Sequence, residues 1–282
     1  MKIPRRGILA AAMSLALAAG ACASTRDRRA DLPAGLSGIG ELPPPASAWP
    51  AAGFDARHSS ATGATGPQTA HVRWARELDG NVTPGPVIGA DGTVIVATNA
   101  GVLHSLDPHS GADVWTFDGM GGYGVDLSTS AAVLRGGTIL WPGPNDTLFA
   151  LSSRGTLLWT ERFAGQVLSP AVAGRNRVYV ADLAGHLTAL EATGATHRKL
   201  WTLDVHGTAY ASATVGPDGT VYTAAGNDLV AVRDLGNTGA QLWRYRAKKI
   251  VEVSNAVAPD GTVVLGTNHD REYGIRPDGN KA

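Results

Sequence analysis

The sequence predicts an all-β fold made of similar four-stranded sheets, and three repeating features carry this prediction. Tryptophans recur at intervals of 41, 44, 42 and 42 residues, at Trp74, Trp115, Trp159, Trp201 and Trp243. A tight turn and two columns of apolar residues recur between them with the same period. A period of about 42 residues divided into four short strands is typical of the blades of a β-propeller.

The repeating unit is clearest over residues 83–115. Its first apolar run ends in the turn Ala90-Asp91-Gly92-Thr93, and two further apolar runs precede Trp115. Asp-Gly and Gly-Gly pairs supply the positive φ angles that tight hairpins need. The same turn recurs at residues 135–138, 174–177, 217–220 and 259–262.

Two columns of apolar residues are expected to pack one sheet on the next. The first column contains Leu103, Leu148, Leu187 and Leu229. The second contains Leu106, Leu151, Leu190, Val232 and Ile275. Glu272 falls in the leucine column of the fifth repeat.

The repeats number five, but only the first four end in an outer strand that carries a tryptophan. Residues 72–78 have the sequence of such a strand. We therefore expect Trp74 to belong to the same blade as residues 263–275, so that an N-terminal strand closes a five-bladed ring and covers its free edge. A truncated or open arc is the alternative.

The N-terminus has the features of an export signal. Residues 1–21 combine basic residues with an apolar stretch too short to span a bilayer, and small residues follow. Without Lys2, Arg5 and Arg6 the chain has 21 basic and 24 acidic residues, a net charge of −3. The protein therefore has no basic field to hold nucleic acid.

Residues 17–22, LAAGAC, resemble a bacterial lipobox, in which the cysteine becomes the lipidated first residue of the mature chain. Cys22 is the only cysteine, so it forms no internal disulfide. We expect a lipid anchor at Cys22 on the periplasmic side of the envelope, with ordinary signal cleavage as the alternative. Ala23 in place of Asp favours the outer membrane, while Arg5-Arg6 leaves both the general and the twin-arginine export routes open.

The mature chain begins with a tether. Residues 22–47 consist largely of Ala, Pro, Gly and charged residues, a composition typical of flexible linkers. The propeller is expected over residues 48–282, with blade repeats from about residue 71. In composition the whole chain is 44% hydrophobic with 36 glycines, as expected of a turn-rich β protein with an ample core.

The repeats resemble those of the PQQ-like (quinoprotein-type) β-propeller family. Residues 105–115, SLDPHSGADVW, match its A-x-D-x-x-T-G-x-x-x-W motif closely, and residues 238–243 and 189–194 match the second and first halves of the motif. Residues 49–60 resemble the WP…D…S segment with which members often open. The resemblance implies the fold and leaves the activity open.

A catalytic site finds little support. Quinoprotein dehydrogenases of this family hold PQQ in a larger ring, commonly with an adjacent-cysteine disulfide, a calcium site and an aspartate base, and a chain with one cysteine cannot reproduce that set. The eight histidines show no clustered spacing that would suit a metal. We therefore assign no catalytic residue, metal ligand or cofactor. A PQQ-dependent or other small-ligand enzyme or sensor remains the alternative.

The mouth of the axial channel is the expected binding site. The innermost strands carry a column of small residues, Gly85, Ser130, Ser169, Ser212 and Ser254, which we interpret as packing around a crowded axis. The ends of these strands and the loops that enter them carry polar and aromatic residues, as a binding face requires. The candidate residues are Tyr123, Asp126, His206, Tyr210, Lys248, Lys249 and Glu252.

These observations favour a non-enzymatic propeller, anchored in the cell envelope, that binds other envelope proteins. This layout resembles that of the propeller lipoprotein in the machinery that assembles outer-membrane β-barrels.

Overall fold

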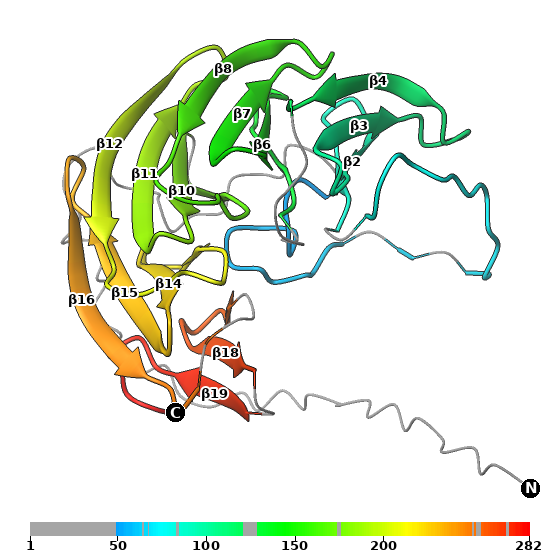
Figure 1. The fold of residues 1–282 in the computed structure, drawn as a ribbon. Coiled ribbons are helices and arrows are strands. Elements are labelled where there is room, and N and C mark those ends of the chain that lie inside the picture. Colours follow the sequence, from blue (N-terminus) through cyan, green and yellow to red (C-terminus); the bar gives the residue numbers. More distant parts are fainter. Residues whose placement is uncertain are drawn as a thin grey trace, which may run out of the picture.

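The computed structural model describes residues 49–282 except 64, 67, 83, 84, 121–128, 174, 175, 250, 252–254, 269 and 270. The described residues form five antiparallel sheets whose strands follow one another in chain order. Figure 1 shows these sheets arranged in an arc about a common axis. The described part contains no helix, and therefore none long and apolar enough to cross a membrane.

The strands have the following bounds. The first sheet contains β1 (Val87–Ile88), β2 (Val94–Ala97), β3 (Val102–Leu106) and β4 (Asp113–Asp118), and the second β5 (Ala132–Val133), β6 (Ile139–Gly143), β7 (Thr147–Leu151) and β8 (Leu157–Arg162). The third contains β9 (Ala171–Ala173), β10 (Arg177–Ala181), β11 (His186–Ala192) and β12 (His197–Asp204). The fourth contains β13 (Thr214–Val215), β14 (Val221–Ala225), β15 (Asp228–Asp234) and β16 (Gly239–Arg246), and the fifth β17 (Ala256–Val257), β18 (Val263–Thr267) and β19 (Arg271–Ile275).

The predicted Asp-Gly-Thr turns join the first and second strands of the sheets. Gly92, Gly219 and Gly261 have φ angles of 85°, 81° and 85°, a conformation that favours glycine. The Asp91 carboxylate accepts hydrogen bonds from the backbone N–H of Thr93 at 3.1 Å and from its hydroxyl at 2.7 Å. The side chain thus fixes the turn that the sequence predicts.

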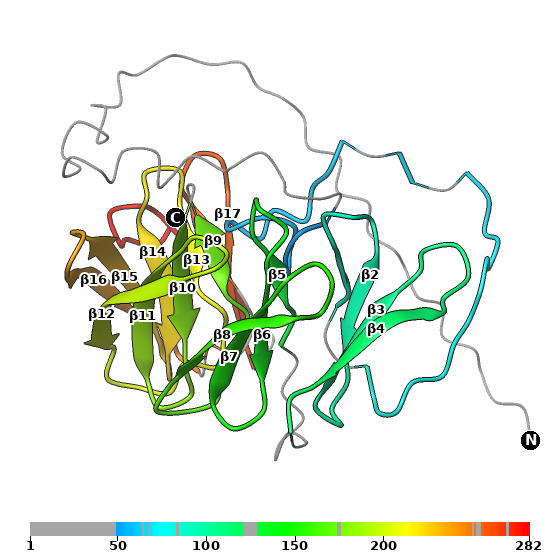
Figure 2. The same ribbon diagram turned by 90° about the horizontal axis from the view of Figure 1, so that it is seen from above.

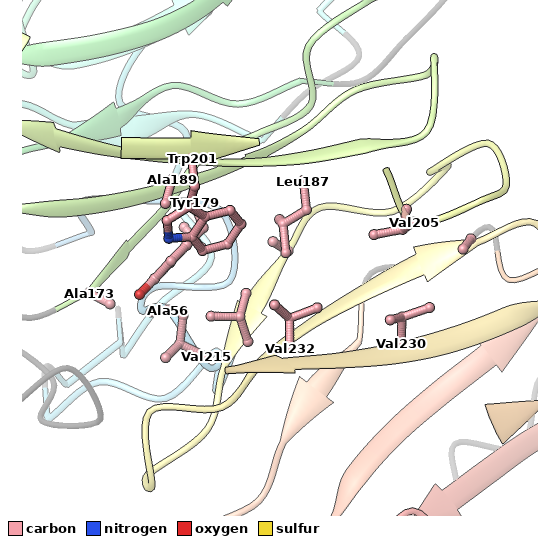
Figure 3. Close-up of a cluster of buried hydrophobic side chains, with 14 residues drawn as sticks. Ala56, Ala173, Tyr179, Leu187, Ala189, Trp201, Val205, Val215, Val230 and Val232 are labelled. Atoms are coloured by element: carbon pink, nitrogen blue, oxygen red, sulfur yellow. The ribbon is translucent and has the colours of Figure 1, made fainter. Parts of the chain in front are cut away.

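The two apolar columns form the core between the sheets, as predicted. Every member of both columns is at most 3% exposed. Figure 3 shows one such cluster, in which Tyr179, Leu187 and Trp201 of the third sheet pack against Val215 and Val232 of the fourth. Stability therefore comes mainly from contacts between neighbouring sheets.

The tryptophan of each outer strand attaches its sheet to the following one. Trp115 donates its indole N–H to the carbonyl of Ser153 in the second sheet at 2.9 Å, and Trp159 donates to Gly194 in the third at 3.0 Å. Trp243 reaches the fifth sheet in the same way. The repeated tryptophans thus set the spacing of the arc.

The predicted closure of the ring is wrong in this structure. The fifth sheet has three described strands, and residues 72–78 are not paired with β19. Instead, Trp74 donates its indole N–H to the carbonyl of Pro108 at 3.0 Å, beside β4 of the first sheet. The outer edge of β19, where the predicted strand would pair, is instead met by the last residues of the chain: the N–H of Ala282 donates to the carbonyl of Gly274 at 2.7 Å, and Lys281 bridges Ile275. The contact of Trp74 with the first sheet does not require its own strand to be paired. The open arc in Figure 1 is therefore the alternative that the structure adopts.

The fifth sheet ends the arc with an exposed face. Val264 is 43% exposed, whereas the residues at its position in the other four sheets are at most 2% exposed. Those residues are Ile95, Leu140, Tyr179 and Tyr222. Glu272 is exposed on the same face. No described sheet covers this face, so the carboxylate of Glu272 stays in solvent although it occupies the position of a buried leucine in the other sheets.

Candidate partner-binding face

The segment of residues 49–57 crosses the arc at one end of the innermost strands. Its carbonyl groups at Trp49, Pro50, Ala56 and Arg57 accept hydrogen bonds from the innermost strands of the first, second, fourth and fifth sheets. The four bonds, to Ile88, Val133, Val215 and Val257, measure 2.7, 2.7, 2.7 and 2.9 Å. Figure 2 shows this blue segment along the upper side, near β5, β9 and β17. We call it the axial strap.

Local side-chain bonds shape the second half of the axial strap. The Asp55 carboxylate accepts hydrogen bonds from the backbone N–H groups of Arg57 at 2.9 Å and Ser59 at 3.1 Å, and from the Ser59 hydroxyl at 2.7 Å. Nδ1 of His58 lies 3.1 Å from the carbonyl oxygen of Asn255. Burial lowers the pKa of His58, so the ring is held neutral and Nδ1–H donates to that carbonyl.

The opposite ends of the innermost strands carry two of the loops that were predicted to bind a partner. The loop after β12 presents His206 and Tyr210, both exposed. It is held tightly, because a Cβ atom on Gly207 would lie 2.8 Å from the backbone of Ala225 in the fourth sheet. The N–H of Gly226 also donates to the carbonyl of Thr208 at 2.8 Å. Two exposed side chains are thus presented on a rigid support.

His206 occupies a strained turn that Asp204 stabilises. Its φ angle is 53°, in the left-handed region. The Asp204 carboxylate accepts the N–H of His206 at 2.7 Å and lies 3.3 Å from its Nδ1. The backbone N–H of His206 lowers the pKa of Asp204. The imidazole and the carboxylate together form a polar, solvent-exposed pair.

The loop after β16 presents Lys248 and Lys249, and both are exposed. It is joined to the His206 loop through the fourth sheet, because Gly226 accepts the N–H of Val251 at 2.9 Å while it donates to the His206 loop. Arg244 strengthens the link: it donates to the carbonyl of Val205 and, at 2.8 Å, to the Asp228 carboxylate. The structure therefore brings His206, Tyr210, Lys248 and Lys249 to one side of neighbouring sheets, which we call the open face.

Comparison with known proteins decides the family. The family model described as outer membrane protein assembly factor BamB matches residues 99–266. The chain belongs to the BamB family. No curated protein matches the sequence.

Two solved structures show the same fold. The crystal structure of BamB from Moraxella catarrhalis superposes with a TM-score of 0.57 at 22% identity, covering 74% of this chain and 62% of that one. The β-propeller domain of Cps50 (Swd1) from Myceliophteria thermophila superposes with a TM-score of 0.56 at 12% identity, covering 71% of this chain and 66% of that one. This BamB-family chain thus spans about three fifths of the length of the Moraxella protein.

Several predicted residues of this BamB-family propeller lie outside the described part of the chain. They are Cys22, Tyr123, Asp126, Glu252 and, in the column of small residues, Ser254, and their predicted roles stay predictions. Among the described residues, no three carboxylate, imidazole or thiol groups come together as a metal site.

The column of small residues around the axis does more than the sequence predicted. The Ser130 hydroxyl donates to the carbonyl of Gly85 at 3.0 Å, and the Ser169 hydroxyl accepts the N–H of Ser130 at 2.7 Å. These bonds join the first three sheets. Small size explains the packing, and the hydroxyl adds a polar contact between sheets that size alone could not predict.

The axial strap is the functional element that sequence reasoning missed. Its signal was present, because residues 49–60 include the aromatic, proline and aspartate positions of the opening segment seen in the wider family. The role of its backbone carbonyls depends on where four separate sheets end. That arrangement cannot be read from a local pattern.

Proposed function

We propose that this BamB-family protein is a non-enzymatic scaffold of the cell envelope that holds other proteins of outer-membrane assembly on its open face. The observation that carries the proposal is the difference between the two sides of the arc. On one side the axial strap bonds its own backbone to four innermost strands, while the other side presents four exposed polar and aromatic side chains on rigid loops. Loops on a fixed β scaffold are common sites of recognition.

The chemistry of the open face suits a polar protein surface. Tyr210 is 42% exposed, and tyrosine is enriched among the residues that dominate binding energy. Lys248, Lys249 and His206 add hydrogen-bond donors, and Asp204 adds an acceptor. A mixture of this kind favours a hydrated protein interface over a closed pocket for an apolar ligand.

Anchoring on the strap side would leave this face accessible. We propose that the exported protein is lipidated at Cys22 and held at the periplasmic side of the outer membrane. The tether meets the described part of the chain at Trp49, which belongs to the axial strap. Because the flexible tether leaves from the strap side, the lipid anchor would not cover the open face.

Site-specific photo-cross-linking in intact cells tests the proposal. A photoreactive residue at Tyr210 should capture an envelope protein that mass spectrometry identifies as part of outer-membrane assembly. The matched control is Arg135, which is exposed in a turn on the strap side. Capture from position 135 and not from 210 would show that the partner binds the strap side and not the open face.

A further inference from the structure

Residues 72–78 form an extended segment without a backbone partner. No backbone hydrogen bond joins them to any other described residue, and no strand is assigned there. Five of the seven residues are exposed, with Val72 at 77%. Figures 1 and 2 show the cyan part of the chain that contains them standing outside the sheets, on the open side of the arc. Unpaired extended backbone of this kind invites pairing with another strand.

Side chains hold the middle of the segment and the residue that follows it in place. Trp74 binds the carbonyl of Pro108, and Arg76 donates to the carbonyl of Gly111 at 2.8 Å and pairs with the Asp113 carboxylate. Just beyond the segment, the Asp79 carboxylate accepts the Thr98 hydroxyl at 2.8 Å. The extended conformation is therefore set before any partner arrives, which lowers the entropy cost of binding.

Its outward-facing charges have no partner within the described chain. Trp74 and Arg76 point toward the first sheet, so alternation along an extended chain directs Arg73, Ala75 and Glu77 away from it. Arg73 and Glu77 are exposed, and neither forms an ion pair with any described residue. A basic and an acidic residue, four positions apart, thus lie on one free surface.

We propose that this segment pairs antiparallel with the same segment of a second copy of the chain, about a two-fold axis at Ala75. In that register Arg73 lies opposite Glu77 of the other copy, and this pair occurs twice. Val72 lies opposite Leu78, which also occurs twice. A two-fold axis requires such self-complementarity, and the sequence provides it in both charge and hydrophobicity.

The charge pattern also selects this register. Moving the axis to Arg76 would place two arginines opposite each other and Arg73 opposite Asp79, whose carboxylate is already bonded to Thr98 and His104. Moving the axis to Trp74 would separate Arg73 from Glu77. Opposite charges directly across a strand pair stabilise it, while like charges destabilise it. The partner of this segment is therefore a second copy of the chain. The proposed interface uses none of the residues of the open face.

Charge reversal at the two free positions tests the pairing. Purified full-length wild-type protein, in detergent where it is lipidated, should show a concentration-dependent dimer in sedimentation velocity. Arg73→Glu and Glu77→Arg should each weaken the dimer by about tenfold or more, because each turns two opposite-charge pairs into two like-charge pairs. Mixing these two variants should restore a heterodimer, and so should combining both changes in one chain.

The matched control is Arg135→Glu, which reverses an exposed charge far along the chain and should leave the dimer constant unchanged. Circular dichroism of each variant checks that the fold is kept. A wild-type protein that stays monomeric up to high concentration would overturn the proposal. So would a dimer that survives both single reversals, or single variants that fail to associate when mixed.

Discussion

The indole N–H of Trp201 donates to the carboxylate of Asp234 at 2.9 Å, where the other three outer-strand tryptophans donate to backbone carbonyls. The same carboxylate accepts the Tyr179 hydroxyl at 2.8 Å and the N–H of Gly236 at 2.7 Å. Nε of Arg177 lies 3.0 Å away, and Asp234 itself is only 1% exposed. One buried charge thus joins the third sheet to the fourth.

Replacement of this carboxylate should strongly destabilise the protein. Asp234→Ala leaves Arg177 without its buried partner and two ring donors unsatisfied, so we expect a loss of about 3–5 kcal/mol in the free energy of unfolding. Asp234→Asn retains an acceptor for Trp201 and should lose less. Urea unfolding of both variants checks this order, and an alanine variant as stable as the asparagine variant would contradict it.

The turn in the axial strap should depend on Asp55. Asp55→Ala removes three hydrogen bonds that shape the turn. The carbonyls of Ala56 and Arg57 should then no longer be positioned to accept the N–H groups of Val215 and Val257. We expect a cost of about 1–2 kcal/mol and faster hydrogen exchange at these two amides. Ser59→Ala removes one of the three bonds and serves as the milder comparison. Equal exchange in wild type and Asp55→Ala would argue against this role.

His58 should make stability depend on pH. Its pKa is lowered by burial, so the unfolded chain binds a proton more readily than the folded one as the pH falls below about 6.5. The contribution is fully present above that pH and is lost as the pH falls toward the folded value. We expect the unfolding midpoint to drop more between pH 7.5 and 5.5 in wild type than in His58→Asn, which keeps a donor. Parallel curves for the two proteins would exclude His58 as the cause.

If Cys22 carries the lipid anchor, its replacement should change the cellular fraction in which the protein is found. Cys22→Ala should move the protein from the membrane fraction to the soluble periplasmic fraction, because the substitution removes every acyl chain that the cysteine would carry. One acyl chain is a marginal membrane anchor, whereas several together form a stable one. Fractionation with immunoblotting measures this. Unchanged partition into membranes would show that another feature holds the protein there.

Sequence reasoning recovered what repeats can encode. The turn at Asp91-Gly92 and the column that contains Leu103 recur with one period, and local backbone and packing demands explain both. Trp74 shows the limit. It docks on the following sheet as the other tryptophans of the series do, but its own segment is not paired with β19. Strand pairing between the two ends of the chain depends on where the last sheet and the C-terminal residues lie, which a local repeat does not encode.

Of the open face, the sequence predicted the loops and the exposed side chains, since both follow from irregular stretches between regular repeats. It could not predict the contacts that join the loops, because the Arg244 bond to Val205 spans 39 residues and links different sheets. The same holds for the strap, which contacts strands up to 200 residues away.

The order of the strap's four bonds along the chain determines how the strap would respond to a pulling force. A pulling force on the tether would reach the bond at Trp49 first, then Pro50, and only later Ala56 and Arg57. The strap would then peel from one strand at a time, as in unzipping, and would not have to shear all four bonds together. Tension between membrane and scaffold would thus be felt first at β1, while the bonds to the fourth and fifth sheets stay intact until the first two have opened.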